Sequence, residues 1–269
     1  MVTIFIISGG FVNLYKNILL YTKIEQLKIS DSFDMKSNIT FQCNKNRFIA
    51  HGGGEINGIS VTDSLEALNF SYNQGFRYLE LDILKTSDGH FVASHDWNSW
   101  KKNNGYDAIL PPTLEEFKNV KIYKKYTPLD MEAINKWFNE HSDAILVTDH
   151  MDEPLKFAKK FIDKNRLMME LFSMNSVYNA IKNNLYGMPT WGVVSQIQGN
   201  KLEILKKLGV KFIVANVEVL NQNKQLFKTL SNNGIKIYFY GKYGKNIDFK
   251  YFYGRYINDI NFIKVCQDG

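Results

Sequence analysis

Cysteine is scarce in this sequence, which has two among 269 residues, Cys43 and Cys266. They form no Cys-x-x-Cys pair and no cysteine/histidine spacing that suits zinc, so we expect no structural zinc site. If the protein is exported, one disulfide could join Cys43 to Cys266. Two unpaired thiols are the simpler interpretation, and the cysteine content leaves the redox compartment open.

Long apolar runs are also scarce. A membrane-spanning helix needs about 20 mostly apolar residues. The first 22 residues come nearest to this, but Asn13, Lys16 and Asn17 interrupt them. The same segment lacks the basic start and the small-residue cleavage site of a signal peptide. We therefore expect 1–45 to be an N-terminal extension, either peripherally associated with a membrane or simply outside the domain formed by 46–269.

The sequence has no dense block of positive charge. Its 33 lysines and arginines exceed its 27 aspartates and glutamates and give a formal net charge of +6, spread along the chain. This diffuse excess is compatible with an anionic substrate or an anionic membrane surface, and it does not indicate binding to nucleic acid. With 45% hydrophobic residues, the chain can bury one large core.

From Arg47 onward, short apolar or β-branched runs alternate with stretches of helical periodicity. This alternation is typical of βα units around a mostly parallel sheet. About eight strands with crossover helices predict an α/β fold, a TIM (β/α)8 barrel with an N-terminal extension. The expected strands are 48–51, 78–84, 91–94, 144–149, 167–172, 191–194, 212–216, 235–240 and 256–257. The expected helices are 64–74, 129–140, 153–163, 175–184, 200–208 and 221–232.

Glu80 and Asp82 are separated by one residue within the expected strand 78–84. Strand alternation places both carboxylates on one face, while Leu79 and Leu81 point the other way. Two carboxylates that face a hydrocarbon interior are costly unless they are paired or bind a cation. A hard divalent ion such as Ca²⁺ or Mg²⁺ suits an all-oxygen site. A solvated or lysine-paired face is the alternative.

Two histidines are expected at the same end of the barrel. His51 closes the first expected strand and precedes Gly52 to Gly54, a loop whose backbone can approach a ligand closely. The turn at Gly89 reverses the chain in a hairpin and returns His95 toward the two carboxylates. Phosphodiester cleavage needs such an inventory, because one group takes a proton, another protonates the leaving alkoxide and a cation holds the phosphate charge.

Together these motifs resemble the glycerophosphodiester phosphodiesterase domain, within the phospholipase C-like phosphodiesterase superfamily. The motifs are His51-Gly52-Gly53, Thr62 to Ala67, Gly75, Glu80-x-Asp82, Thr86-x-Asp88-Gly89 and His95-Asp96. Their order and spacing make the combination specific. The later βα pattern up to Asp259 is compatible with the rest of that domain.

The resemblance implies roles for five residues. His51 and His95 are expected to form a general acid/base pair. Glu80 and Asp82 are expected to bind one divalent cation, Ca²⁺ or Mg²⁺, together with a carboxylate from a later strand. For this third ligand we choose Asp149, at the end of its expected strand. The implied substrate is a glycerophosphodiester or another small or lipid-derived phosphodiester.

The chain departs from the family pattern in three places. Gly52 stands where an arginine usually follows the first histidine. Thr62 and Asp63 stand where a Glu-Asn pair is usual. Beyond Asp149 the usual Glu-x-Lys is not reproduced, because Met151 takes the place of the lysine. These departures bear on the substrate more than on the fold.

Two later residues are candidates for substrate contact. Glu170 interrupts an apolar strand and could face the barrel mouth, with a lysine-paired strand edge as the alternative. Trp191, on a later expected strand, could line the substrate cleft, with core packing as the alternative. The segment from Gly254 to Asp259 resembles the closing strand of the family and would put Asp259 at the active-site end.

The sequence therefore predicts a metal-dependent phosphoric diester hydrolase that uses two histidines. One alternative keeps the site but releases a cyclic phosphate, as a phospholipase-type lyase does. Another is a non-catalytic barrel that binds a phosphate-bearing ligand. The released alcohol, the oligomeric state and the compartment are left open.

Overall fold

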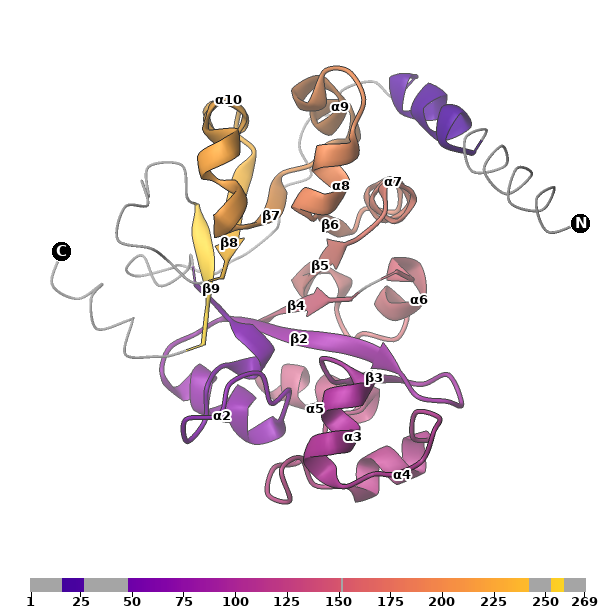
Figure 1. Cartoon of the computed structure of the whole chain (residues 1–269), viewed down its shortest axis with the longest axis vertical. Helices are drawn as coiled ribbons and strands as arrows, with labels where there is room; N and C mark the ends of the chain where they lie inside the picture. Colours follow the sequence, from indigo (N-terminus) through magenta and orange to yellow (C-terminus); the bar gives the residue numbers. More distant parts are fainter. Residues whose placement is uncertain (1–15, 27–47, 151, 242–252, 259–269) are drawn as a thin grey trace, which may run out of the picture.

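The computed structural model describes residues 16–26, 48–150, 152–241 and 253–258 (Figure 1). The strands are β1 (Phe48–Ala50), β2 (Tyr78–Lys85), β3 (Phe91–Ala93), β4 (Ile145–Asp149), β5 (Leu167–Leu171), β6 (Tyr186–Pro189), β7 (Phe212–Asn216), β8 (Lys236–Tyr240) and β9 (Gly254–Ile257). The α-helices are α2 (Leu65–Asn73), α3 (Trp97–Asn104), α4 (Leu114–Asn119), α5 (Met131–Glu140), α6 (Pro154–Ala158), α7 (Met174–Lys182), α8 (Trp191–Gln196), α9 (Lys201–Leu208) and α10 (Lys224–Asn232). Short 3-10 helices are η2 (His51–Gly53), η3 (Lys164–Arg166), η4 (Val217–Val219) and η5 (Asn221–Asn223).

The described strands form a nearly closed barrel. Eight of them pair in parallel in the order β6-β5-β4-β2-β1-β9-β8-β7. An isolated parallel bridge between Thr190 and Val214 joins the two ends of this order. Strand β3 pairs antiparallel with β2 and lies outside the ring. The predicted TIM barrel is confirmed, and its helices lie between successive strands (Figure 1).

Side-chain alternation divides the buried residues between the barrel interior and the layer under the helices. In β4, Ile145 and Val147 belong to the interior cluster, whereas Leu146 belongs to the larger cluster that contains helical residues such as Leu68. The interior cluster consists of Ile49, Tyr78, Ile145, Val147, Met168, Tyr186, Met188, Phe212, Val214, Tyr238 and Tyr256. Glu80 follows Tyr78 by two residues in β2, and Glu170 follows Met168 by two residues in β5, so each glutamate lies on the interior face of its strand. The polar groups therefore lie at one end of a packed core.

One expected strand is wrong. Residues 191–194 form the start of α8, and the barrel strand before it is β6. In β6, a Cβ at Gly187 would lie 2.6 Å from Cδ1 of Leu171, so glycine allows the close approach. Glycine and Pro189 weaken the sequence signal of β6, while the β-branched Val193 imitates a strand signal in a buried helical turn.

An insertion between β2 and α5 contains two helices, α3 and α4, that the sequence analysis missed. Each buries one residue, Trp100 in α3 and Phe117 in α4, so no long apolar periodicity marks them. Their rings stack with centroids 5.5 Å apart in a small separate core. Asp96 caps α3 by accepting a hydrogen bond from the Ser99 N–H at 2.7 Å. The helix therefore begins just after His95 and fixes the chain there.

Residues 16–25 form a helix whose Leu20 and Ile24 are buried in the main core cluster. Figure 1 shows this indigo helix outside the ring of strands. Among the described helices, none combines the length and the apolar character that crossing a membrane requires. The rest of the predicted N-terminal extension and both cysteines lie outside the described residues, so those expectations stay predictions.

Candidate active site

The sequence-predicted residues converge on one cavity of about 520 Å³ at the barrel end where β4 and β5 finish. Six of the seven line it, namely His51, Glu80, His95, Asp149, Glu170 and Trp191. The seventh, Asp82, is fully buried and lies next to His150, which also lines the cavity. Three aromatic side chains also line the wall, namely Phe172 just after β5, Tyr240 of β8 and Tyr256 of β9.

Glu80 is almost completely buried, and the loop after β1 holds one of its oxygens. The Gly52 N–H donates to Oε2 of Glu80 at 2.6 Å, whereas Oε1 has no hydrogen-bond partner among the described residues. Gly52 has a φ of 56°, and a Cβ there would lie 2.4 Å from Cα of Val61. Only glycine fits this approach, so the arginine usual at this place has no room.

Asp63 is a further buried carboxylate, to which the sequence analysis gave no role. Its Oδ1 accepts a hydrogen bond from the Asp82 N–H at 3.1 Å. Burial, followed by repulsion from Asp82, raises the pKa of Asp63 well above its ordinary value. Burial, followed by repulsion from the same two aspartates, also raises the pKa of Glu80 well above its ordinary value. An asparagine at position 63 cannot ionise, so the sequence difference adds one titratable carboxyl to this site.

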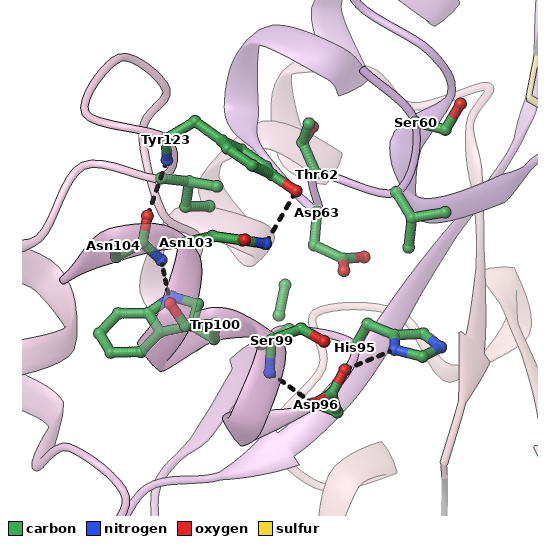
Figure 2. Close-up of a pocket in the computed structure, with 14 residues that line it drawn as sticks. Ser60, Thr62, Asp63, His95, Asp96, Ser99, Trp100, Asn103, Asn104 and Tyr123 are labelled. Carbon is green, nitrogen blue, oxygen red and sulfur yellow. Dashed lines mark hydrogen bonds and ion pairs between the residues drawn. The ribbon is translucent and has the colours of Figure 1, made fainter. Parts of the chain in front are cut away.

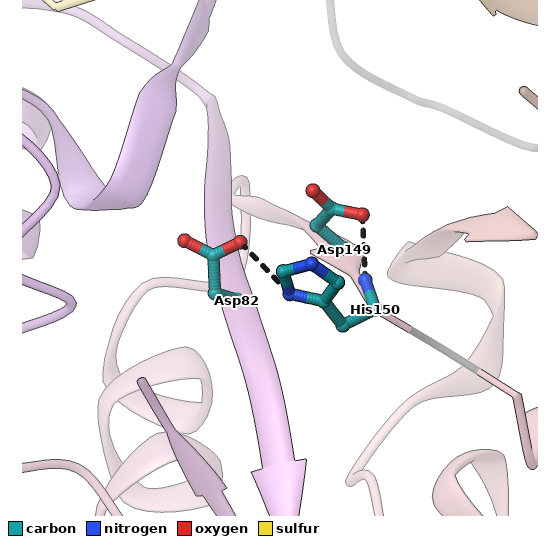
Figure 3. Close-up of side chains that lie close together, drawn as sticks. All are labelled: Asp82, Asp149 and His150. Carbon is teal, nitrogen blue, oxygen red and sulfur yellow. Dashed lines mark hydrogen bonds and ion pairs between the residues drawn. The ribbon is translucent and has the colours of Figure 1, made fainter. Parts of the chain in front are cut away.

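Asp82, Asp149 and His150 present ligand atoms that all lie within 4.8 Å of one another (Figure 3). Neither carboxylate oxygen of Asp82 has a hydrogen-bond partner among the described residues, although Nδ1 of His150 lies 3.5 Å from Oδ1. Carboxylates buried in this way are costly unless they are protonated or bind a cation. The donor set fits one divalent cation, held by carboxylates of β2 and β4 and reached by the imidazole of His150.

His51 approaches the cavity from the end of β1 and is held by a residue that the sequence analysis missed. Its Nδ1 lies 2.7 Å from Oδ1 of Asn258, which follows β9. Because an amide oxygen only accepts, Nδ1 carries a hydrogen, and in the neutral ring the lone pair is then on Nε2. The sequence analysis placed the neighbouring Asp259 at the active-site end, and Asp259 lies outside the described residues.

His95 follows β3 and reaches the cavity from the end of the β2–β3 hairpin that lies away from its turn. Its Nδ1 lies 3.1 Å from Oδ2 of Asp96, and its ring centroid lies 5.5 Å from that of His150. Burial lowers the pKa of His95, but the negative charges of Asp82 and Asp96 outweigh this and hold it above its ordinary value. The raised pKa favours the protonated form, which can donate a proton.

The two residues predicted to contact substrate lie on the cavity wall. Glu170 is buried and accepts a hydrogen bond from the Tyr256 hydroxyl. Burial, followed by repulsion from Asp149, raises the pKa of Glu170 well above its ordinary value. Trp191 begins α8, and its ring packs 4.8 Å from that of Phe227 in α10. It therefore serves the core and the cavity wall together.

Solved structures share this fold. A glycerophosphodiester phosphodiesterase from Parabacteroides distasonis has a TM-score of 0.65 at 17% identity, over 84% of this chain and 98% of that chain. An Oleispira antarctica phosphodiesterase, in complex with the product sn-glycerol-3-phosphate, has a TM-score of 0.66 at 16% identity, over 83% and 97% of the two chains. At such identities the likeness shows the fold. No curated protein sequence matches this chain.

The sequence carries a family match of its own. Residues 58–126 match the model of the Glycerophosphoryl diester phosphodiesterase family. The match is confined to this segment, which is well under half of the chain. The match agrees with the predicted resemblance to this family and with the predicted enzyme class, phosphoric diester hydrolase. The matched segment contains Glu80, Asp82 and His95, while His51 and Asp149 lie outside it.

Proposed function

We propose that this enzyme hydrolyses a glycerophosphodiester or a related small phosphodiester with one divalent cation and two histidines. The observation that carries the proposal is the set of buried, unpartnered carboxylate oxygens on Glu80 and Asp82, beside a cavity lined by both histidines. Among the described lining residues of this cavity, none is lysine or arginine. Carboxylates alone would repel a phosphodiester, so a cation is needed to reverse the local charge.

The cation would be held by Glu80, Asp82 and Asp149, and carboxylate oxygens suit Ca²⁺ or Mg²⁺. When bound, such an ion offsets the negative charge that develops on the phosphate oxygens. The imidazole of His150 lies within reach of the same position. If it also binds, metals that accept nitrogen ligands, such as Mn²⁺ or Zn²⁺, gain relative to Mg²⁺.

The partners of the two histidines suggest how the proton transfers are divided. We assign His51 as the base, because Asn258 leaves its Nε2 free to accept a proton. We assign His95 as the acid, because it lines the cavity and the Asp96 carboxylate, 3.1 Å from its Nδ1, stabilises the protonated ring. A hydroxyl of the substrate, or water, loses its proton to His51 while its oxygen forms a bond to phosphorus. The bond from phosphorus to the second alcohol breaks, and that oxygen takes the proton of His95.

A glycerol phosphate arm is the substrate feature with the most direct support. The Oleispira antarctica relative was solved with sn-glycerol-3-phosphate as its product. If the hydroxyl of this arm attacks phosphorus, a cyclic phosphate forms first and water must open it. Hydrolysis therefore ends in glycerol 3-phosphate, whereas a lyase would stop at the cyclic product.

The proposal is tested by following glycerophosphocholine and glycerophosphoethanolamine by ³¹P NMR, with Mg²⁺, Ca²⁺ or EDTA. We expect glycerol 3-phosphate to accumulate with a cation and not with EDTA. Accumulation of a cyclic phosphate would instead support the lyase. Absence of any product with either cation, from folded protein that still binds the ion, would contradict hydrolysis of these diesters and favour a binding function.

A further inference from the structure

A second cavity, of about 300 Å³, borders the active site (Figure 2). It lies between the segment before α2 and the insertion that contains α3. His95 is the residue that lines both cavities. The group that we assign as the acid therefore separates two spaces, one lined by the carboxylates Glu80 and Asp149 and one lined mainly by the insertion.

Most of the polar groups that line the second cavity are uncharged. Hydroxyl and amide side chains contribute most of the polar wall, namely Ser60, Thr62, Ser94, Ser99, Asn103, Asn104 and Tyr123. Among its described lining residues there is no lysine or arginine. Its two carboxylates already have partners, since Asp63 accepts from the backbone of Asp82 and Asp96 caps α3. This chemistry suits hydroxyl groups and disfavours a second phosphate or a carboxylate.

A chain of hydrogen bonds holds the far wall in place. Nδ2 of Asn103 donates to the Tyr123 hydroxyl at 2.9 Å, and the Tyr123 N–H donates to Oδ1 of Asn104 at 2.7 Å. Nδ2 of Asn104 donates to the Trp100 carbonyl at 2.8 Å. Figure 2 shows Asn103 and Tyr123 meeting on one side of the hollow, with His95 on the other. The polar groups are therefore ordered before any ligand arrives.

We propose that the second cavity binds the alcohol that leaves the phosphodiester, and that this alcohol is a small uncharged polyol such as glycerol or a cyclic sugar alcohol. The proposal rests on the proposed function, in which His95 protonates the leaving oxygen. A phosphodiester has two arms, and the arm that receives this proton must lie beside His95. The second cavity offers that arm hydroxyl and amide partners, while the phosphate and the retained arm stay in the larger cavity.

The test compares kcat/KM for glycerophosphoglycerol and glycerophosphoinositol with kcat/KM for glycerophosphoserine and bis(p-nitrophenyl) phosphate. The last probe has activated leaving groups that need neither an acid nor a polyol site. We expect the two polyol diesters to be preferred over glycerophosphoserine. We expect Asn103→Leu to lower kcat/KM for glycerophosphoglycerol about tenfold relative to kcat/KM for bis(p-nitrophenyl) phosphate, because a polar partner of the alcohol is lost.

The control is Asn183→Leu, the same change at the exposed asparagine that caps the C-terminal end of α7. This variant should leave every ratio unchanged. If Asn103→Leu does not fold, Tyr123→Phe removes one hydroxyl from the same wall. Wild-type protein that cleaves none of these diesters with any cation would overturn the proposed function. Wild-type protein that cleaves bis(p-nitrophenyl) phosphate, but shows no polyol preference or keeps its ratio in the variants, would overturn this inference alone.

Discussion

Nδ1 of His51 lies 2.7 Å from Oδ1 of Asn258, although 207 positions separate the two residues along the sequence. The parallel pairing of β1 with β9 creates this contact, since Ala50 pairs with Ile257 and each functional residue follows directly. Closure of the barrel therefore sets the tautomer of a residue that we place in the chemistry. The contact depends on the fold and not on local sequence.

Removing the Asn258 side-chain oxygen should impair catalysis through His51. We expect Asn258→Leu to lower kcat about 10- to 100-fold, because the imidazole loses its fixed tautomer and orientation. Asn258→Asp keeps an acceptor and adds a negative charge, so it should retain most of the activity and move the acidic limb of the pH–rate profile to higher pH. Equal losses in both variants, with no movement of the profile, would contradict a positioning role.

Gly52 and Gly58 form a matched pair for testing the loop after β1. Both have positive φ, but a Cβ at Gly58 meets nothing within 4 Å, whereas one at Gly52 meets Cα of Val61 at 2.4 Å. Gly58→Ala should cost about 1–2 kcal/mol of unfolding free energy from its backbone conformation alone. Gly52→Ala should cost clearly more, measured by urea unfolding, and should weaken cation binding by displacing its N–H from Glu80. Equal costs would show that the loop adjusts.

Cation binding tests whether His150 is a metal ligand. By titration calorimetry, His150→Ala should weaken Mn²⁺ binding about tenfold and Mg²⁺ binding much less, because imidazole is a poor ligand for Mg²⁺. Glu80→Gln should weaken both. His90→Ala serves as the control, since His90 is half exposed in the β2–β3 hairpin. Unchanged Mn²⁺ affinity in His150→Ala would remove this residue from the ligand set.

The stability of the metal-free protein should fall as the pH rises. Burial is the main cause of the raised pKa values of Asp63, Glu80 and Glu170. A carboxyl with a raised folded pKa stabilises the fold below its unfolded pKa, and this contribution is lost as the pH rises through the folded value. Asp96 has the opposite effect. Burial raises its pKa, but hydrogen bonds from Ser99 and His95 lower it to about 2. The stability that Asp96 contributes is therefore lost only as the pH falls toward that value, below the range of this test.

The measurement is thermal unfolding in EDTA between about pH 5 and pH 8, a range that lies above the ordinary pKa of a carboxyl. The unfolding midpoint should decrease toward pH 8, and a bound divalent cation should reduce the decrease. Glu170→Gln should reduce it in the absence of the cation. A midpoint that rises steadily over this range in EDTA would contradict the account of the carboxylates.

Strand periodicity made part of the site predictable. Alternation along β2 puts Glu80 and Asp82 on one face whatever the rest of the chain does, and the hairpin turn returns His95 toward them. The barrel followed from the repeated βα pattern. These features depend on short-range rules that a single sequence displays.

Other parts depend on contacts between distant segments. Asn258 matters because β9 lies beside β1, and Asp63 matters because its loop brings it under Asp82. The strand expected at Trp191 failed because β-branched residues after it favour a strand locally, whereas burial against the barrel selects a helical turn. The strand β6 was not predicted, because its glycine and proline have low strand propensity.

The most direct test of the account is the turnover of glycerophosphocholine with Mg²⁺ by wild-type protein, His51→Ala, His95→Ala and the control His90→Ala, with cation binding measured on the same samples. We predict that each active-site variant loses about 100-fold or more in kcat, while cation affinity and the thermal unfolding midpoint stay close to wild type and His90→Ala keeps full activity. Wild-type turnover that persists in either active-site variant would contradict the two-histidine site.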